Sequence, residues 1–119
     1  AAPEALDVFV LPEPRISEVI GYPFHLGMLG CGRRPDLSRL DDLLGARTLV
    51  ACPHLQNLEN LGLILRTAAA LGVDGMLLGD KGSDPFFRRC VRVSMGTVFT
   101  LPIVRSPHVG RDLLRLRDE

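Results

Sequence analysis

Long apolar runs are missing from this chain of 119 residues. No stretch approaches the ~18 consecutive apolar residues that suggest a membrane-spanning helix. The first residues also lack the charged-then-apolar pattern of a secretory signal. With 46% hydrophobic and 24% charged residues, the composition is that of a globular protein and not of a disordered one. We therefore expect a cytoplasmic protein of one ordinary domain, with room for part of a second.

Cysteine and histidine patterns that would indicate disulfides or metal sites are also missing. The three cysteines (Cys31, Cys52 and Cys90) form no Cys-x-x-Cys pair. An odd number without a signal peptide predicts reduced thiols, and the simplest interpretation is that they act as small apolar residues. The three histidines (His25, His54 and His108) are far apart in sequence and lack metal-ligand spacing, so no metal is expected.

Net charge is the third absence. Fourteen basic residues balance fourteen acidic ones, so the chain as a whole has no electrostatic attraction for nucleic acid or membrane. The charge is nevertheless uneven along the chain. Residues 81–105 carry one acid, Asp84, and five basic residues, which are Lys81, Arg88, Arg89, Arg92 and Arg105. Residues 36–42 lean acidic.

Several nucleotide and hydrolase motifs are absent as well. No GxGxxG follows a predicted strand, and GDKGS at residues 79–83 falls short of the P-loop pattern GxxxxGK[ST]. No GxSxG nucleophile elbow is present, and Ser94 has no base beside it in sequence. A dinucleotide-dependent dehydrogenase, a P-loop NTPase and a serine hydrolase are therefore poorly supported.

From residue 47 onward the sequence alternates between apolar runs and helical patterns. Continuous apolar runs favour strands that are buried on both faces, as in a parallel sheet. The expected strands are residues 48–52, 75–79 and 97–104, and the expected helices are residues 58–71, 86–95 and 111–119. This order predicts an α/β fold with right-handed crossovers.

The first 46 residues are less regular, and we predict an N-terminal extension or connector there. Residues 8–11 are a short apolar run that ends at Pro12, which predicts a strand. A helical turn is expected at residues 15–20, with Gly21 as its stop. Residues 22–35 are rich in glycine and proline and predict irregular backbone with an extended piece at 26–29. Leucines at helical spacing predict a helix at 37–44 with Gly45 as its C-cap.

Asn60 and Arg66 are polar residues on the otherwise apolar helix that follows the first strand. Ligands of open parallel sheets bind beyond the carboxyl ends of the strands, which places residues 52–60, 79–85 and the end of the third strand at the functional edge. Six residues span about 9 Å of helix. Because helical side chains lean toward the N-terminus, Arg66 could reach back toward Asn60, and Gly62 leaves room for it.

Simpler interpretations stay open for these residues. Asn60 could cap the helix, and Arg66 could be a surface arginine whose stem covers apolar area. Arg88, Arg89 and Arg92 could form a solvated helix face, although the spacing of Arg88 and Arg92 also allows both to meet phosphates.

Three ordered stretches carry a family resemblance across residues 20–104. The stretch LENLGLILRTAAALGVDGMLLGD resembles the first signature motif of the SpoU (TrmH) group of SPOUT RNA methyltransferases. The later RRCVRVSMGTVFTLPI is similar to the helix and strand that follow in that family. The earlier GYPFHLGMLGCGRRP is similar to the family connector, although it has Leu26 in place of an arginine and Gly30 in place of an alanine.

The resemblance implies 2′-O-methylation of ribose in rRNA or tRNA with S-adenosylmethionine as methyl donor. It implies an α/β trefoil-knot (SPOUT) fold and a homodimer in which the partner subunit completes each active site. It also suggests that residues 1–46 are a remnant of an RNA-binding domain. The motif residues correspond to Asn60 and Arg66 as the catalytic pair. Because guanidinium stays protonated, we expect Arg66 to orient the 2′-hydroxyl through a phosphate contact and not to act as a general base. Phosphate contacts are expected from basic residues, namely Arg33, Arg34, Arg88, Arg89 and Arg92.

The later family motifs, a Gly/Glu-rich loop and an IPM…SLN segment, do not occur in residues 1–119. We therefore expect residues 47–119 to be the N-terminal part of the methyltransferase domain, with the cofactor-binding residues beyond Glu119. The 119-residue chain alone is expected to be inactive and not to bind S-adenosylmethionine measurably. The alternative is a non-catalytic RNA-binding or dimerisation module on the same scaffold, and the sequence downstream of Glu119 would distinguish the two.

Overall fold

The computed structural model describes residues 7–25 and 27–119, and these divide into two compact units, residues 1–33 and 34–119. Residues 34–46, which the sequence assigns to the connector, belong to the second unit. In that unit the backbone N–H of Ser38 donates to the carbonyl of Ile103 at 2.9 Å. The domain boundary expected after residue 46 stays a prediction.

The second unit is built on a parallel sheet of three short strands in the order β1-β2-β3. The strands are β1 (Leu49–Cys52), β2 (Gly75–Gly79) and β3 (Ile103–Ser106). The helices are α2 (Leu58–Ala70), α3 (Arg88–Val93) and α4 (Val109–Asp118), with 3₁₀ turns η1 (Leu40–Leu43) and η2 (Thr97–Phe99). The predicted parallel α/β fold is confirmed.

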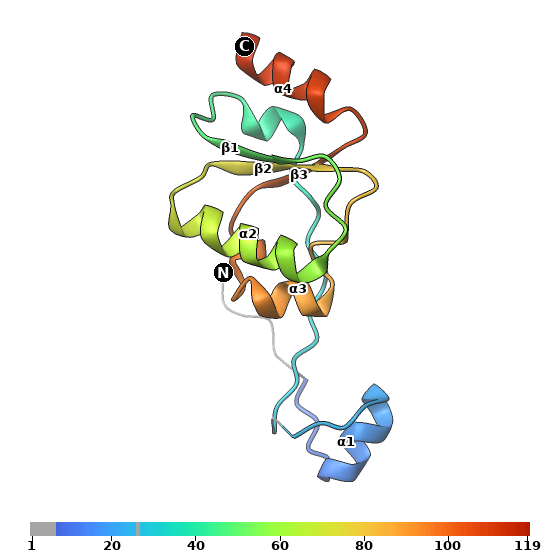
Figure 1. Ribbon diagram of the computed structural model, residues 1–119. Coiled ribbons are helices and arrows are strands. Elements are labelled where there is room, and N and C mark those ends of the chain that lie inside the picture. Colours follow the sequence, from blue (N-terminus) through green and yellow to red (C-terminus); the bar gives the residue numbers. More distant parts are fainter. Residues whose placement is uncertain (1–6, 26) are drawn as a thin grey trace. The chain divides into compact units, whose positions relative to one another are not determined.

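Helices cover both faces of this sheet (Figure 1). The helices α2 and α3 lie on one face, whereas α4 lies on the other. Each face has its own core. Beneath α2 and α3 the buried residues include Leu61, Leu65 and Met76. Beneath α4 they include Leu77 and Val104. The central strand β2 is buried along its whole length because it supplies side chains to both cores.

Two strand predictions need correction. β1 is only half-buried, and Ala51 is exposed, because β1 lies at one edge of the three-stranded sheet. The third strand begins at Ile103 and not at residue 97, since Thr97–Phe99 form a 3₁₀ turn. Pro102 therefore precedes the strand, where its carbonyl accepts from the N–H of Met76 at 2.8 Å.

Gly62 lies buried where α2 packs on α3. A Cβ at this position would be 2.8 Å from the Cβ of Val93 and 2.9 Å from the carbonyl oxygen of Cys90. Glycine is therefore required for the close approach of the two helices. The idea that Gly62 makes room for Arg66 is wrong, because the space is filled by α3.

The first unit contains α1 (Glu13–Ile20), which ends at Gly21 with a φ of 77°. This confirms the helical turn and the stop predicted from the sequence. The strand predicted at residues 8–11 is wrong, since these residues pair with no strand among those described and are mostly exposed. Gly27–Pro35 has no regular structure, and Leu26 lies outside the described residues. The helix predicted at 37–44 is shortened to η1.

Candidate functional site

A cleft of about 530 Å³ opens at the carboxyl ends of all three strands. The residues that line it come from the three segments that follow the strands, namely Pro53, His54, Gly79, Asp80 and residues 106–111. The sequence had placed residues 52–60, 79–85 and the end of the third strand at this edge. All three segments contribute to the cleft, so a cavity lies at the predicted edge, and its role in function stays a prediction.

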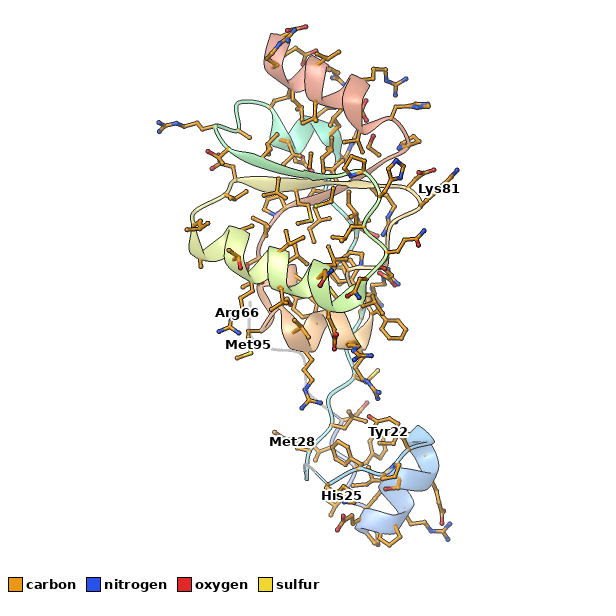
Figure 2. The ribbon with its side chains drawn as sticks, in the orientation of Figure 1. Tyr22, His25, Met28, Arg66, Lys81 and Met95 are labelled. Atoms are coloured by element: carbon orange, nitrogen blue, oxygen red, sulfur yellow. The ribbon has the colours of Figure 1, made fainter. Side chains whose placement is uncertain are left out.

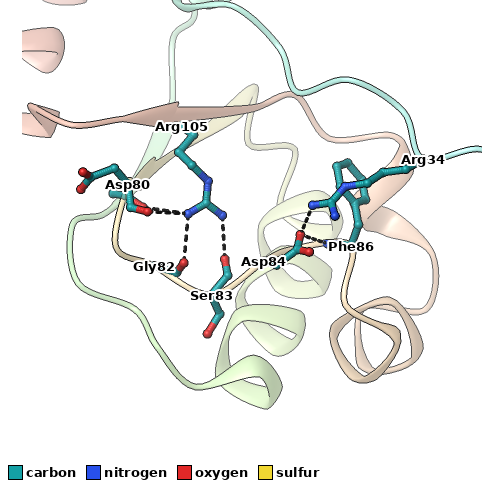
Figure 3. Close-up of polar contacts among 8 residues, drawn as sticks. Arg34, Asp80, Gly82, Ser83, Asp84, Phe86 and Arg105 are labelled. Atoms are coloured by element: carbon teal, nitrogen blue, oxygen red, sulfur yellow. Dashed lines mark hydrogen bonds and ion pairs between the residues drawn. The ribbon is translucent and has the colours of Figure 1, made fainter.

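Arg105 on β3 holds one wall of the cleft in place (Figure 3). Its guanidinium donates to the backbone carbonyls of Asp80 at 3.0 Å, Gly82 at 2.9 Å and Ser83 at 2.9 Å, with a longer bond of 3.3 Å to Gly79. Five N–H groups in a planar fork suit such a set of acceptors. Arg105 thus fixes the loop after β2 instead of offering its charge to a ligand.

A second wall of the cleft is fixed by a buried hydrogen bond. The hydroxyl of Ser106 donates to the Asp112 carboxylate at 2.6 Å and accepts from the backbone N–H of His108 at 2.9 Å. The Ser106 bond, and after it the nearby Arg111, lowers the pKa of Asp112 below its usual value although burial opposes the shift. The start of α4 is therefore tied to the end of β3 by an ionised carboxylate.

This pair predicts a specific dependence of stability on pH. Because the pKa of Asp112 is lower in the folded state, its contribution is complete above the unfolded pKa of about 3.9 and is lost as the pH falls through the folded value. Asp112→Asn should cost about 1–3 kcal/mol at pH 7. In urea titrations from pH 7 to pH 2, the difference between wild type and variant should shrink below about pH 4. A difference that is constant with pH would contradict this role.

Asn60 is exposed in the first turn of α2 but does not cap the helix. Asn57 is the N-cap, and its side-chain oxygen accepts from the backbone N–H of Asn60 at 2.9 Å. The capping interpretation of Asn60 is therefore wrong. Within the described residues the Asn60 side chain has no hydrogen-bond partner, so its amide is available to a ligand.

Arg66 is exposed on α2 and points away from the sheet (Figure 2). Among the described residues its guanidinium forms no ion pair or hydrogen bond. At 100° per residue, six positions place Arg66 about 120° around the helix from Asn60. Neither residue lines the cleft at the strand ends. The structure thus presents both side chains to solvent from α2 and does not bring them together within one chain.

The arginines predicted to bind RNA separate into different environments. Arg89 donates to the Glu59 carboxylate at 2.9 Å and so links α3 to α2. Arg34 pairs with Asp84, and its guanidinium lies 5.1 Å from the centre of the Phe86 ring (Figure 3). Arg33, Arg88 and Arg92 are exposed. Arg34 and Arg89 therefore already have carboxylate partners.

The histidines His54 and His108 were not selected from the sequence, yet both line the cleft. They are 54 positions apart, so spacing gave no signal. The available clue was that each lies two residues after the end of a strand, since parallel strands bring such residues to one edge. Lys81 extends from the neighbouring loop (Figure 2).

Every buried side-chain nitrogen and oxygen among the described residues has a hydrogen-bond partner. The expectation that the cofactor-binding residues lie beyond Glu119 stays a prediction. No group of three His, Cys, Asp or Glu side chains in the described part of the chain could hold a metal ion. No helix in that part is long and apolar enough to cross a membrane.

Comparison with known proteins identifies the family. Residues 47–119 match the SpoU rRNA Methylase family. The chain therefore belongs to the SpoU rRNA methylase family, and its parallel α/β fold is that of SpoU methyltransferases. The match covers the whole sheet together with the helix that carries Asn60 and Arg66.

Individual relatives agree with this assignment. An uncharacterized tRNA/rRNA methyltransferase of Mycobacterium tuberculosis is 38% identical over 104 residues, which are 87% of this chain and 36% of that protein. A Bacillus subtilis 23S rRNA (guanosine(2553)-2′-O)-methyltransferase is 37% identical over 55% of this chain and 26% of its own length. The crystal structure of an rRNA methyltransferase from Sinorhizobium meliloti matches with a TM-score of 0.62 and 36% identity, over 71% of this chain and 32% of that chain. Its S-adenosylmethionine-bound form matches with a TM-score of 0.58 and 33% identity, over 70% of this chain and 32% of that chain. The chain thus spans about a third of the length of these relatives.

Proposed function

We propose that the protein carrying this chain methylates the 2′-oxygen of a ribose in rRNA or tRNA, with S-adenosylmethionine as the methyl donor. The observation that carries the proposal is the segment from Asn60 to Arg66, which lies within the family match and presents both polar side chains to solvent. The B. subtilis relative named as a 2′-O-methyltransferase supports the choice of the ribose oxygen.

Arg66 suits the binding of an RNA phosphate. Its guanidinium is permanently charged, and it has no protein partner among the described residues that would compete with a phosphate. A bidentate contact to a phosphate beside the target ribose would fix the direction of the 2′-hydroxyl. Asn60 would then hold the ribose by hydrogen bonds. The methyl donor supplies a methyl group activated by its sulfonium charge, so positioning of the nucleophile is the main task left to these residues.

A homodimer is part of this proposal. The two residues face solvent from α2 and lie outside the cleft at the strand ends. The described residues of one chain do not enclose Asn60 and Arg66, so a site that uses both side chains needs groups from elsewhere. A second subunit packed against α2 would enclose both side chains, and we propose that it completes the site.

The remaining basic residues would contribute sequence-independent affinity. Arg33, Arg88 and Arg92 are exposed and could contact phosphates in the cytoplasm, where rRNA and tRNA are found. Arg34 and Arg89 would do so only by sharing or leaving their carboxylate partners. We therefore rank Arg33 and Arg92 above Arg34 and Arg89 as RNA contacts.

The decisive experiment compares RNA from cells with and without the gene. Nuclease digests of rRNA and tRNA would be analysed by mass spectrometry for a ribose that gains one methyl group. We expect one 2′-O-methylated nucleotide to disappear when the gene is deleted and to return on complementation. If rRNA and tRNA are unchanged, the protein is not the proposed enzyme, and the non-catalytic RNA-binding module becomes the better interpretation.

A further inference from the structure

Two of the three aromatic side chains of the second unit are more than half exposed, namely Phe87 and Phe99. Residues 34–119 contain three aromatic residues, Phe86, Phe87 and Phe99, and none of them is fully buried. The buried residues of both cores are aliphatic residues, methionine and Cys90, and the partly buried Phe86 packs against the first core. Phenylalanine is a costly residue to leave in water, since its burial contributes about 1.5–3 kcal/mol. The exposure of Phe87 and Phe99 to solvent therefore needs an explanation.

Two of these rings form a stack with an arginine beside it. The centroids of Phe86 and Phe99 are 6.0 Å apart, and the ring planes differ by 17°. The Arg34 guanidinium lies 5.1 Å from the centre of Phe86 and is held by Asp84. We call Arg34, Phe86 and Phe99 the aromatic platform. Phe99 remains 57% exposed although it is stacked.

A small groove runs along the aromatic platform. Its volume is about 150 Å³, and its lining includes Pro35, Asp36, Ser38, Phe86, Phe99 and Thr100. Pockets for whole small-molecule ligands are usually about 300–1,000 Å³, so this groove suits one planar ring. It shares no lining residue with the cleft at the strand ends. It is therefore a separate feature from the candidate site.

We propose that the aromatic platform stacks one unpaired base of the RNA substrate, an inference that rests on the proposed function. Unpaired bases of RNA stack on aromatic rings and on arginine planes, whereas bases inside a duplex cannot reach such a surface. The Asp36 carboxylate in the groove would repel a phosphate but can accept a hydrogen bond from an exocyclic amino group. The groove therefore suits the base and not a phosphate.

The absence of tryptophan from the chain allows a direct test. Phe99→Trp would introduce a single indole whose fluorescence is quenched when a base stacks on it. The full chain would be titrated with single-stranded oligoadenylate of eight nucleotides, with the matching abasic ribose-phosphate strand and with duplex RNA. We expect strong quenching by the single strand and little by the other two. Equal quenching by the abasic strand would overturn the proposal.

Phe87→Trp is the matched control. Phe87 is 54% exposed, close to the 57% of Phe99, but does not line the groove. The quenching of its indole by oligoadenylate should be several-fold smaller. The same quenching at both positions would mean unspecific contact with the basic surface and would refute a base site in the groove.

An affinity measurement separates base stacking from other roles of Phe99. Phe99→Leu keeps an apolar side chain and should weaken oligoadenylate binding about tenfold, while abasic-strand binding stays unchanged. Because Phe99 is more than half exposed, the thermal midpoint should change little, which circular dichroism would verify. If Phe99→Leu instead dissociates a dimer in sedimentation experiments and leaves RNA binding intact, the aromatic platform is a protein contact and the proposal is wrong.

The test is independent of the enzymatic proposal. Methyl transfer with no stacking at Phe99 would leave the proposed function standing and remove this inference. If a base stacks at Phe99 but RNA methylation is unchanged on gene deletion, base stacking would be supported and the proposed enzymatic function would be refuted.

Discussion

Arg66→Ala should lower methyl transfer by the whole protein by at least about 100-fold while leaving the fold intact. The loss follows from the positioning role, since removal of one charge-bearing donor in a catalytic site typically costs 10²–10³ in rate. The fold should survive because Arg66 is exposed and makes no ion pair or hydrogen bond within the described residues. Incorporation of labelled methyl groups into RNA would measure the activity, and urea unfolding would measure the stability.

Arg47→Ala is a suitable control for Arg66→Ala. Arg47 is also exposed, and its only hydrogen bond among those described is made by its backbone N–H, which donates to Asp74 at 2.8 Å. It lies before β1 and thus at the opposite edge of the sheet from the cleft. The control should retain nearly full activity. Arg66→Lys should recover only part of the lost rate, because a lysine cannot form the bidentate phosphate contact. Full activity of Arg66→Ala would refute the assignment.

Gly79→Ala should destabilise the fold by about 3 kcal/mol or more. A Cβ on Gly79 would lie 1.9 Å from the carbonyl oxygen of Pro53 and 2.8 Å from its carbonyl carbon. The obstacle is backbone and not a flexible side chain, so β1 and β2 would have to separate where β2 ends. Both residues also line the cleft, and its shape would change as well. Urea titration at pH 7 would give the loss of stability directly.

Gly110→Ala provides the matched control for this prediction. Gly110 also lines the cleft, but a Cβ there would meet no atom within 4 Å. It lies in the first turn of α4, where alanine is a better helix former than glycine. We expect no loss and a gain of up to about 1 kcal/mol. If both changes destabilised the fold to a similar extent, the clash with Pro53 would not be the reason why Gly79→Ala is unstable.

Most elements of the second unit could be predicted because their signals are local. The apolar run at Gly75–Gly79 and the helix that ends before Gly72 agree with the structure within one or two residues. Errors arose where a local pattern was ambiguous. The run TVFTLPIV reads as one strand, yet the backbone folds into a 3₁₀ turn before Pro102 and only then enters the sheet.

The candidate site was predictable in part. The strand-end rule identified the edge where the cleft opens, whereas the role of Asn60 and Arg66, which the family motif selected, stays a prediction. The capping role of Asn57 was missed. Asn57 and Asn60 are both asparagines and cap helices equally well, so only the residue at which the helix begins distinguishes them. His54 and His108 were missed because nothing in their spacing links them.

The sequence by itself determined the alternation of strands and helices, the family and the segments that gather at the carboxyl edge. These depend on the periodicity of apolar residues and on short motifs, which act over a few residues of chain. Only the tertiary structure decided which arginines are engaged, since Arg34 finds Asp84 at a separation of 50 residues and Arg105 finds carbonyls more than 20 residues away. It also decided why Gly62 and Gly79 must be glycine. Such contacts depend on strand register and helix packing, which bring distant residues together in ways that no local pattern encodes.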